Sequence, residues 1–349
     1  MSQKNETLSL FSAVVITIGL IFGGLWFLME RWAQLSGTVP KASESSNTDN
    51  PINQFVNNNR CNVPNLPEGT FNYGGSTTWA PIRKEADSVL QNQCPQFILR
   101  YTQSPSAEPG SGTGIRMLID NQLAFSQSSR SVKAEENTEA KQKGFSLKEI
   151  PVAIDGIAIA VNHNLNIPGL TVAQLKDIYT GKIINWQQVG GPNLPIIVYS
   201  RTKEAGGTVD FFVENVLNKE NFAANVSYVD NTTDAVRKVA TNTGAIYYAS
   251  ASEIVPQCTI KSLPIGRISG QFLPPYQEPV IPQSECPNKR NQLNNKVFRS
   301  GDYAITRNLF VIVKENGQTD QQAGFAYANW LLTPQAQELI QKAGFVRIK

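Results

Sequence analysis

Histidine is almost absent from this chain. His163 is the one histidine among 349 residues, so a histidine-based metal centre or a serine triad would have to depend on it alone. It lies in Asn-His-Asn after an apolar run, which predicts a loop at the end of a strand. We therefore expect no bound metal, no cofactor and no enzymatic reaction.

Strong net charge is also lacking. The formal net charge is only +3 and no run of lysine and arginine occurs, so we expect no nucleic-acid partner. Hydrophobic residues make up 41% of the chain and charged residues 17%, which is the balance of a globular protein. A length of 349 residues exceeds one typical core and predicts two lobes or domains.

Cysteine is scarce and never occurs in the C-x-x-C spacing of a zinc or redox site. The chain has four cysteines, an even number that suits an oxidising compartment. More than one pairing is possible. Proximity in the sequence favours Cys61 with Cys94 and Cys258 with Cys286.

The N-terminus carries a long uncharged stretch, residues 11–29. It approaches the length of about 20 residues that a membrane-spanning helix needs. A cleaved signal peptide usually has a shorter apolar core and a small-residue site, and no clear site follows Met29. We favour an uncleaved transmembrane helix within residues 1–32 over a signal segment that is removed. Residues 33–60, rich in Ser, Asn, Thr and Pro, predict a flexible linker to a folded part outside the cytoplasm.

Three short turns rich in Gly, Ser and Thr each precede a helical apolar pattern. They are Gly75-Ser-Thr-Thr, Gly110-Ser-Gly-Thr-Gly and Gly206-Gly-Thr. The first N–H groups of a helix lack partners within the helix and carry partial positive charge, and hydroxyl groups add further donors. The glycines of any one turn could simply permit close packing. Together the three turns predict one oxyanion site made from helix N-termini.

The remainder of the chain alternates short β-branched runs with helical stripes, which is typical of an α/β protein. Residues 151–161 and 303–313 are near-continuous apolar runs, typical of strands buried on both faces. We expect these two runs to form a pair of strands that crosses between lobes. The charged residues 132–148 predict a solvated helix.

Two further segments offer donors for an oxyanion. Residues 123–131 predict a strand that ends in a loop containing several hydroxyl groups and Arg130. A short predicted strand, residues 196–199, leads into Ser200 and Arg201. A guanidinium group there can make a two-pronged contact with phosphate or carboxylate, although an ordinary surface arginine would fit the same pattern.

These residues carry a resemblance to the phosphate-binding proteins of phosphate ABC transporters, which have the type II periplasmic-binding-protein fold of two α/β lobes joined by two crossing strands. The resemblance spans about residues 68–349 and implies that residues 61–150 and 303–349 form lobe 1 and residues 151–302 form lobe 2. It rests on Gly75-Ser-Thr-Thr-Trp-Ala-Pro, Gly110-Ser-Gly-Thr-Gly-Ile, Leu175-Lys-Asp-Ile-Tyr-Thr-Gly-Lys-Ile-Ile-Asn-Trp186, Ser200-Arg201, Gly206-Gly-Thr208 and Gly244-Ala-Ile-Tyr-Tyr.

The resemblance also implies a phosphate site in the cleft between the lobes. The predicted ligand-binding residues are Thr77, Thr78, Ser111, Ser129, Arg201, Gly206, Gly207 and Thr208. Ser129 is a departure, because the family typically has an aspartate there that accepts a proton of the anion. A serine can donate or accept, so the preference for phosphate over sulfate stays open, with Glu204 or Asp210 as candidates to replace the aspartate.

The function that the resemblance implies is capture of inorganic phosphate, or of a related tetrahedral oxyanion, by closure of the lobes. The protein would act as a monomer in the periplasm or outside the cell, anchored to the cytoplasmic membrane by residues 11–29, and would deliver the anion to an ABC permease. Two alternatives are a membrane-anchored oxyanion sensor or adhesion module, and a phosphatase on the same scaffold. The phosphatase would need a histidine or carboxylate cluster to activate a nucleophile, and the predicted site contains none.

Overall fold

The computed structural model describes residue 61 and residues 63–202 and 206–348. The predicted membrane segment at residues 11–29 and the linker at residues 33–60 lie outside these ranges. Within the described ranges, no helix combines the length and the apolar character that crossing a membrane requires.

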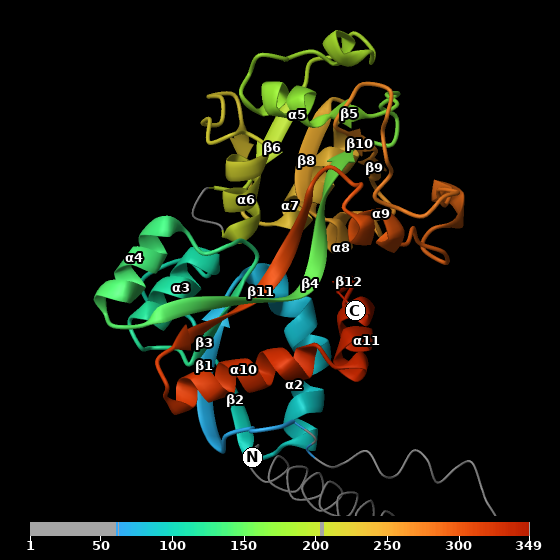
Figure 1. The fold of residues 1–349 in the computed structure, drawn as a ribbon. Helices are drawn as coiled ribbons and strands as arrows, with labels where there is room; N and C mark the ends of the chain where they lie inside the picture. Colours follow the sequence, from blue (N-terminus) through green and yellow to red (C-terminus); the bar gives the residue numbers. More distant parts are fainter. Residues whose placement is uncertain (1–60, 62, 203–205, 349) are drawn as a thin grey trace, which may run out of the picture. The chain divides into compact units, whose positions relative to one another are not determined.

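Lobe 1 is built on parallel strands covered by helices. Strand β1 lies between β2 and β3 and runs parallel to both. In Figure 1 these strands form the lower part of the molecule, with α2 on one side and α3 and α4 on the other. The elements of lobe 1 are β1 (Gly69–Gly75), the short 3-10 helix η2 (Thr77–Trp79), α2 (Ala80–Gln93), β2 (Phe97–Tyr101), α3 (Ser111–Ile119), β3 (Phe125–Ser128), α4 (Ala134–Gln142), α10 (Thr319–Leu331), α11 (Pro334–Lys342) and β12 (Val346–Arg347).

Lobe 2 has a similar plan. Strand β8 pairs in parallel with β6, which in turn pairs in parallel with β7. The elements of lobe 2 are β5 (Leu170–Thr171), α5 (Val172–Tyr179), η3 (Trp186–Val189), β6 (Ile197–Ser200), α6 (Gly207–Asn215), β7 (Ser227–Tyr228), α7 (Thr232–Thr241), β8 (Ala245–Ser250), α8 (Ala251–Ile254), β9 (Lys261–Leu263), β10 (Ile265–Gly266), η5 (Gln283–Glu285) and α9 (Asn295–Ser300).

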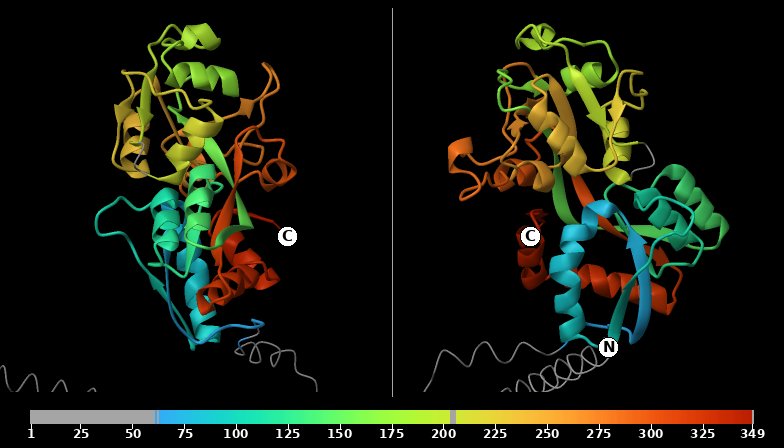
Figure 2. Two further views of the ribbon diagram at one scale, coloured as in Figure 1. Left: turned by 60° about the vertical axis from the view of Figure 1, so that its left-hand side comes forward. Right: turned by 180° about the vertical axis from the view of Figure 1, so that it is seen from behind.

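Two long strands connect the lobes. Strands β4 (Ser146–Val161) and β11 (Thr306–Glu315) form an antiparallel pair. Strand β11 also pairs with β3, and β4 with β8, so one sheet continues through both lobes in the order β2-β1-β3-β11-β4-β8-β6-β7. The views in Figures 1 and 2 show β4 and β11 crossing side by side from one group of elements to the other. The predicted α/β fold with two lobes is confirmed.

The helix predicted over residues 132–148 is wrong in its second half. Helix α4 ends at Gln142, and Gly144 follows it with a φ of 90°. Residues 146–148 already pair with β11. A glycine in the left-handed region ends a helix readily, and the pairing with β11 then outweighs the helical preference of the charged residues.

Each lobe has its own hydrophobic core. The core of lobe 1 contains Trp79 and a stack of Phe125 on Tyr327, whose ring centroids lie 4.7 Å apart. The core of lobe 2 contains Phe212 of α6 stacked on Tyr248 of β8, with ring centroids 3.6 Å apart. Burial of such rings holds α6, and with it the first turn of that helix, in a fixed position on the sheet.

Two disulfide bonds reinforce the lobes. Cys61 pairs with Cys94 at the end of α2, and Cys258 pairs with Cys286 beside η5. The pairing favoured by proximity in the sequence is confirmed. Both bonds close local loops, with sequence separations of 33 and 28 residues, so each restrains one lobe without linking the two.

Candidate functional site

Lobe 1 contributes a cluster of serine hydroxyl groups. It lies where β1 and β3 end and α3 begins, because parallel neighbouring strands end at the same edge of a sheet. Ser76 Oγ donates to Ser129 Oγ at 3.0 Å, and Ser129 N donates to Ser111 Oγ at 3.1 Å. All three residues have 0% exposure. Ser76 belongs to the first predicted turn but was not among the predicted site residues.

Glycine allows these elements to approach so closely. A methyl group on Gly75 would lie 2.3 Å from the carbonyl oxygen of Gln127, and one on Gly114 would lie 2.4 Å from Cα of Gly75. Both distances are far below van der Waals contact, so no other residue fits without displacing the backbone. The N-terminus of α3 is thereby packed directly on the end of β1.

Lobe 2 contributes the N-terminus of α6. Gly206 precedes the helix with a φ of 107°, Gly207 begins it, and Thr208 lies in its first turn. A methyl group on Gly207 would lie 2.2 Å from Ser129 Oγ and 2.3 Å from Ser111 Oγ. The backbone of Gly207 therefore lies directly against the serine cluster of lobe 1.

The threonines meet across the same boundary. Thr78 Oγ1 of lobe 1 and Thr208 Oγ1 of lobe 2 are 3.3 Å apart. Thr77 Oγ1 lies 3.7 Å from the position of a methyl group on Gly206. The structure thus brings the predicted threonines, serines and glycines of all three turns together where the lobes touch.

Arg201 lies directly behind this boundary, on the lobe 2 side. It follows β6 and lines a small hollow of about 10 Å³ together with Thr208, Tyr248 and Glu253. Its Nε is buried and has no hydrogen-bond partner within the described part of the chain. A buried guanidinium nitrogen without a partner is energetically costly, which favours a site that an acceptor can complete.

An ion pair between the crossing strands lies next to the site and was not predicted from the sequence. Arg307 Nε and Nη2 of β11 donate to Asp155 Oδ2 of β4 at 3.0 and 2.8 Å. Burial raises the pKa of Asp155, while the Arg307 guanidinium opposes that rise. A signal for this pair was present, because each residue is a single charge inside one of the two apolar runs. Buried charges in central strands need partners.

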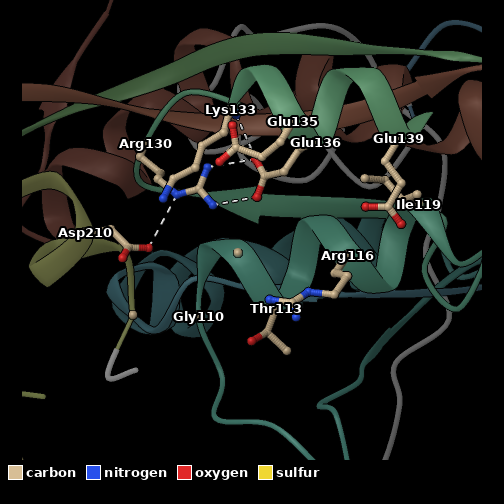
Figure 3. Close-up of a pocket in the computed structure, with 12 residues that line it drawn as sticks. Gly110, Thr113, Arg116, Ile119, Arg130, Lys133, Glu135, Glu136, Glu139 and Asp210 are labelled. Carbon is tan, nitrogen blue, oxygen red and sulfur yellow. Dashed lines mark hydrogen bonds and ion pairs between the residues drawn. The ribbon is translucent and has the colours of Figure 1, made fainter. Parts of the chain in front are cut away.

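Arg130 forms two further ion pairs at the rim of the site, one within lobe 1 and one across to lobe 2. Figure 3 shows Arg130 held on Glu136, with Asp210 of α6 pointing at it from the other lobe. Arg130 Nη2 lies 2.7 Å from Glu136 Oε1, and Arg130 Nε lies 3.5 Å from Asp210 Oδ2. These residues border a groove of about 440 Å³. Asp210 therefore faces Arg130, while Glu204, the other candidate to replace the aspartate, lies outside the described residues.

No group of three or more histidine, cysteine, aspartate or glutamate side chains suited to a metal occurs in the described ranges. His163 follows β4, as predicted for a strand end, and its Nε2 lies 3.0 Å from the carbonyl oxygen of Cys258. The hydroxyl, backbone N–H and guanidinium groups that meet at the lobe boundary can donate hydrogen bonds to an anion.

Comparison with known protein families finds a match over most of the chain. The family described as PBP superfamily domain matches residues 63–335. Phosphate-binding protein PstS of Staphylococcus epidermidis is 27% identical over 284 residues, which cover 80% of this chain and 79% of the relative. The protein of the same name from Staphylococcus haemolyticus is 28% identical over 281 residues, which cover 78% and 79%.

Solved structures agree with this match. A substrate-binding protein from Clostridium perfringens with bound phosphate has a TM-score of 0.62 at 26% identity and covers 80% of this chain and 100% of its own. An ABC-type phosphate transport receptor from Vibrio cholerae has a TM-score of 0.61 at 22% identity and covers 79% and 99%. The second likeness supports the fold alone.

Proposed function

The chain belongs to the PBP superfamily domain family, and from this premise we propose that it binds inorganic phosphate outside the cytoplasm and delivers it to an ABC permease. The relatives named phosphate-binding protein PstS and the phosphate-bound Clostridium perfringens structure support phosphate as the anion. The proposed role involves no chemical step, so the protein is a binding component and not an enzyme.

One observation carries this proposal. The N-termini of α3 and α6 come from opposite lobes and meet through Gly207, which lies against the hydroxyl groups of Ser111 and Ser129. Helix N-termini and hydroxyl groups are donors that an oxyanion satisfies. The buried Nε of Arg201, which has no hydrogen-bond partner among the described residues, adds an unsatisfied charged donor next to Thr208.

The proposed mechanism is capture between the lobes. Gly207 fills the space over the serine cluster, so the anion enters only when lobe 2 moves away from lobe 1. Once bound, it accepts hydrogen bonds from both lobes and draws them together. Because these contacts exist together only in the closed state, the anion shifts the equilibrium toward closure. The closed, liganded form is the one that a permease would recognise.

The predicted residues divide between the lobes in this proposal. Thr77, Thr78, Ser111 and Ser129 act from lobe 1, which comprises residues 61–150 and 303–349. Arg201, Gly206, Gly207 and Thr208 act from lobe 2, which comprises residues 151–302. The boundaries of these ranges fall within β4 and just before β11, so the crossing strands would serve as the hinge.

Attachment to the membrane completes the proposal. Residues 11–29 anchor the protein to the cytoplasmic membrane, and residues 33–60 act as the tether that lets a monomeric binding domain reach the permease. The uncharged character of residues 11–29 supports the anchor. The two disulfide bonds support an oxidising location outside the cytoplasm.

Calorimetric titration of the full chain in mild detergent tests the proposal. The protein is first stripped of bound anion and then titrated with phosphate, arsenate and sulfate. We expect a phosphate Kd of about 1 µM or tighter. If every oxyanion binds more weakly than about 1 mM, the proposed transport function is wrong.

A further inference from the structure

Arg307 occupies the middle of the hinge. It lies on β11 directly opposite Asp155 of β4 in the register of the two crossing strands. Its side chain and that of Asp155 are each 1% exposed. Figure 1 shows β11 and β4 running between the two lobes, and Arg307 contacts residues of both.

The charge of Arg307 is already balanced. Two of its nitrogens donate to Asp155 Oδ2, and the other oxygen of Asp155 accepts from Ser250 Oγ. Arg307 thus differs from Arg201, whose buried Nε has no hydrogen-bond partner in the part of the chain that the structure describes. An arginine whose charge is neutralised adds little charge to an anion site. Any contribution of Arg307 to anion binding must therefore come from the hydrogen bonds of its remaining N–H groups.

Those remaining groups point at the anion-binding turns of both lobes. Arg307 Nη1 donates to the carbonyl oxygen of Gly207 at 3.1 Å. Arg307 Nη2 donates to Thr208 Oγ1 at 2.8 Å and to Thr78 Oγ1 at 3.3 Å. One side chain therefore links η2 of lobe 1 with the first turn of α6 in lobe 2.

This link determines the direction of the threonine hydrogen bonds. A guanidinium group has donors and no acceptor, so a threonine oxygen that bonds to it must accept. One hydrogen of Nη2 serves Asp155, and the two threonine oxygens share the other, with the shorter distance to Thr208. Each hydroxyl proton then points away from Arg307. Only one of the two hydroxyls can donate to the other across their 3.3 Å separation, which leaves at least one proton directed elsewhere.

We propose that Arg307 is a positioning residue for the anion site: it holds the oxygens of Thr78 and Thr208 as acceptors, so that at least one of the two hydroxyl protons faces the anion, and it does so only while the lobes are closed. This inference rests on the proposed function for the identity of the ligand. The ion pair of Asp155 and Arg307 would then contribute to specificity, because hydroxyl groups held as donors favour oxygen atoms of the anion that carry no proton.

A double-mutant cycle with inorganic phosphate tests the positioning role. Phosphate affinity is measured for the wild type, Arg307→Lys, Thr208→Val and the double variant. We expect each single variant to weaken binding about tenfold. Because Arg307 acts through the hydroxyl, adding Arg307→Lys to Thr208→Val should weaken binding by no more than about twofold further. Independent, multiplying effects would overturn the inference.

Two control variants guard against loss of folding. Arg267→Lys replaces an exposed arginine that donates to backbone carbonyl oxygens of lobe 2, and the phosphate affinity of this variant should equal that of the wild type. The pair variant Asp155→Asn with Arg307→Gln removes both charges together, which avoids leaving one buried charge alone. The pair variant should weaken phosphate binding about as much as Arg307→Lys does. A pair variant with wild-type phosphate affinity would contradict the positioning role.

A measurement without anion separates this inference from the proposed function. Spin labels on cysteines at exposed Lys141 of lobe 1 and Lys219 of lobe 2 report the distance between the lobes. In stripped protein, Arg307→Lys should shift the distance distribution toward longer values, and an unchanged distribution would contradict the link between lobes. A wild type that binds no phosphate contradicts the proposed function alone, and the distance measurement still decides the role of Arg307.

Discussion

The two lobes contribute to the candidate site in different ways. On the lobe 1 side, Ser76, Ser111 and Ser129 are fully buried and hydrogen-bonded to one another. On the lobe 2 side, the backbone of Gly207 and the hydroxyl of Thr208 lie against lobe 1, and Arg201 Nε has no hydrogen-bond partner among the described residues. Lobe 1 thus presents hydroxyl groups that are already ordered, and lobe 2 presents charge and close backbone approach. In the proposed function, closure brings the ordered hydroxyl groups of lobe 1 together with the guanidinium donor of lobe 2.

A substitution of Gly207 is the strongest test of this difference between the lobes. Substitution Gly207→Ala places a methyl group about 2.2 Å from Ser129 Oγ, so the lobes should no longer close. We expect phosphate affinity to fall about 100-fold, at the upper end of the cost of overpacking of about 1–3 kcal/mol. Calorimetry measures the affinity, and Asn215→Ala at the exposed end of α6 serves as the control.

The same variant should remain folded. The φ of Gly207 lies outside the left-handed region, and replacing a glycine by alanine where the backbone needs no positive φ stabilises a protein by about 0.4–1 kcal/mol. The thermal unfolding temperature should therefore stay level or rise. A variant that binds phosphate as the wild type does would show that close approach of Gly207 is not needed.

The charge of lobe 2 is tested at Arg201. Substitution Arg201→Ala should weaken phosphate binding at least about tenfold, because a charge-assisted contact contributes about 1.5–3 kcal/mol. Arg237→Ala removes an exposed arginine of the same lobe and should leave the affinity unchanged. Equal affinities of the wild type and Arg201→Ala would remove Arg201 from the site.

A substitution of Ser129 tests the ordered hydroxyl groups of lobe 1, and it has the smallest expected effect on binding. Ser129→Asp introduces a carboxylate that can accept the proton of a protonated phosphate and that repels sulfate. The ratio of phosphate to sulfate affinity should rise about fivefold or more, which corresponds to about 1 kcal/mol for one added discriminating contact. Ser129→Asn has a similar size without charge and serves as the control. A ratio that is level or lower in Ser129→Asp would contradict the predicted equivalence of Ser129 and the aspartate of the family.

Much of the site was predictable because each part of it is local in sequence. A glycine-rich turn followed by a helical stripe defines a helix N-terminus within a few residues, and α3 and α6 begin within one residue of the predicted turns. The place of Arg201 at the end of β6 was likewise predicted, while its contact with the anion stays a prediction. Sequence-local patterns were less reliable where a distant strand competes, as in residues 146–148, which pair with β11 instead of extending α4.

The sequence by itself determined the α/β class, the presence of hydrogen-bond donors suited to an anion, and the local pairing of cysteines. These follow from patterns over short stretches of chain. Only the tertiary structure decided which donors meet. Arg307 contacts Thr78 and Thr208, which are 229 and 99 residues away along the chain. No local preference specifies such contacts. They arise because the antiparallel pairing of β4 with β11 buries two charges opposite each other at the hinge, and a buried charge must be paired and hydrogen-bonded by whatever the two lobes bring to it.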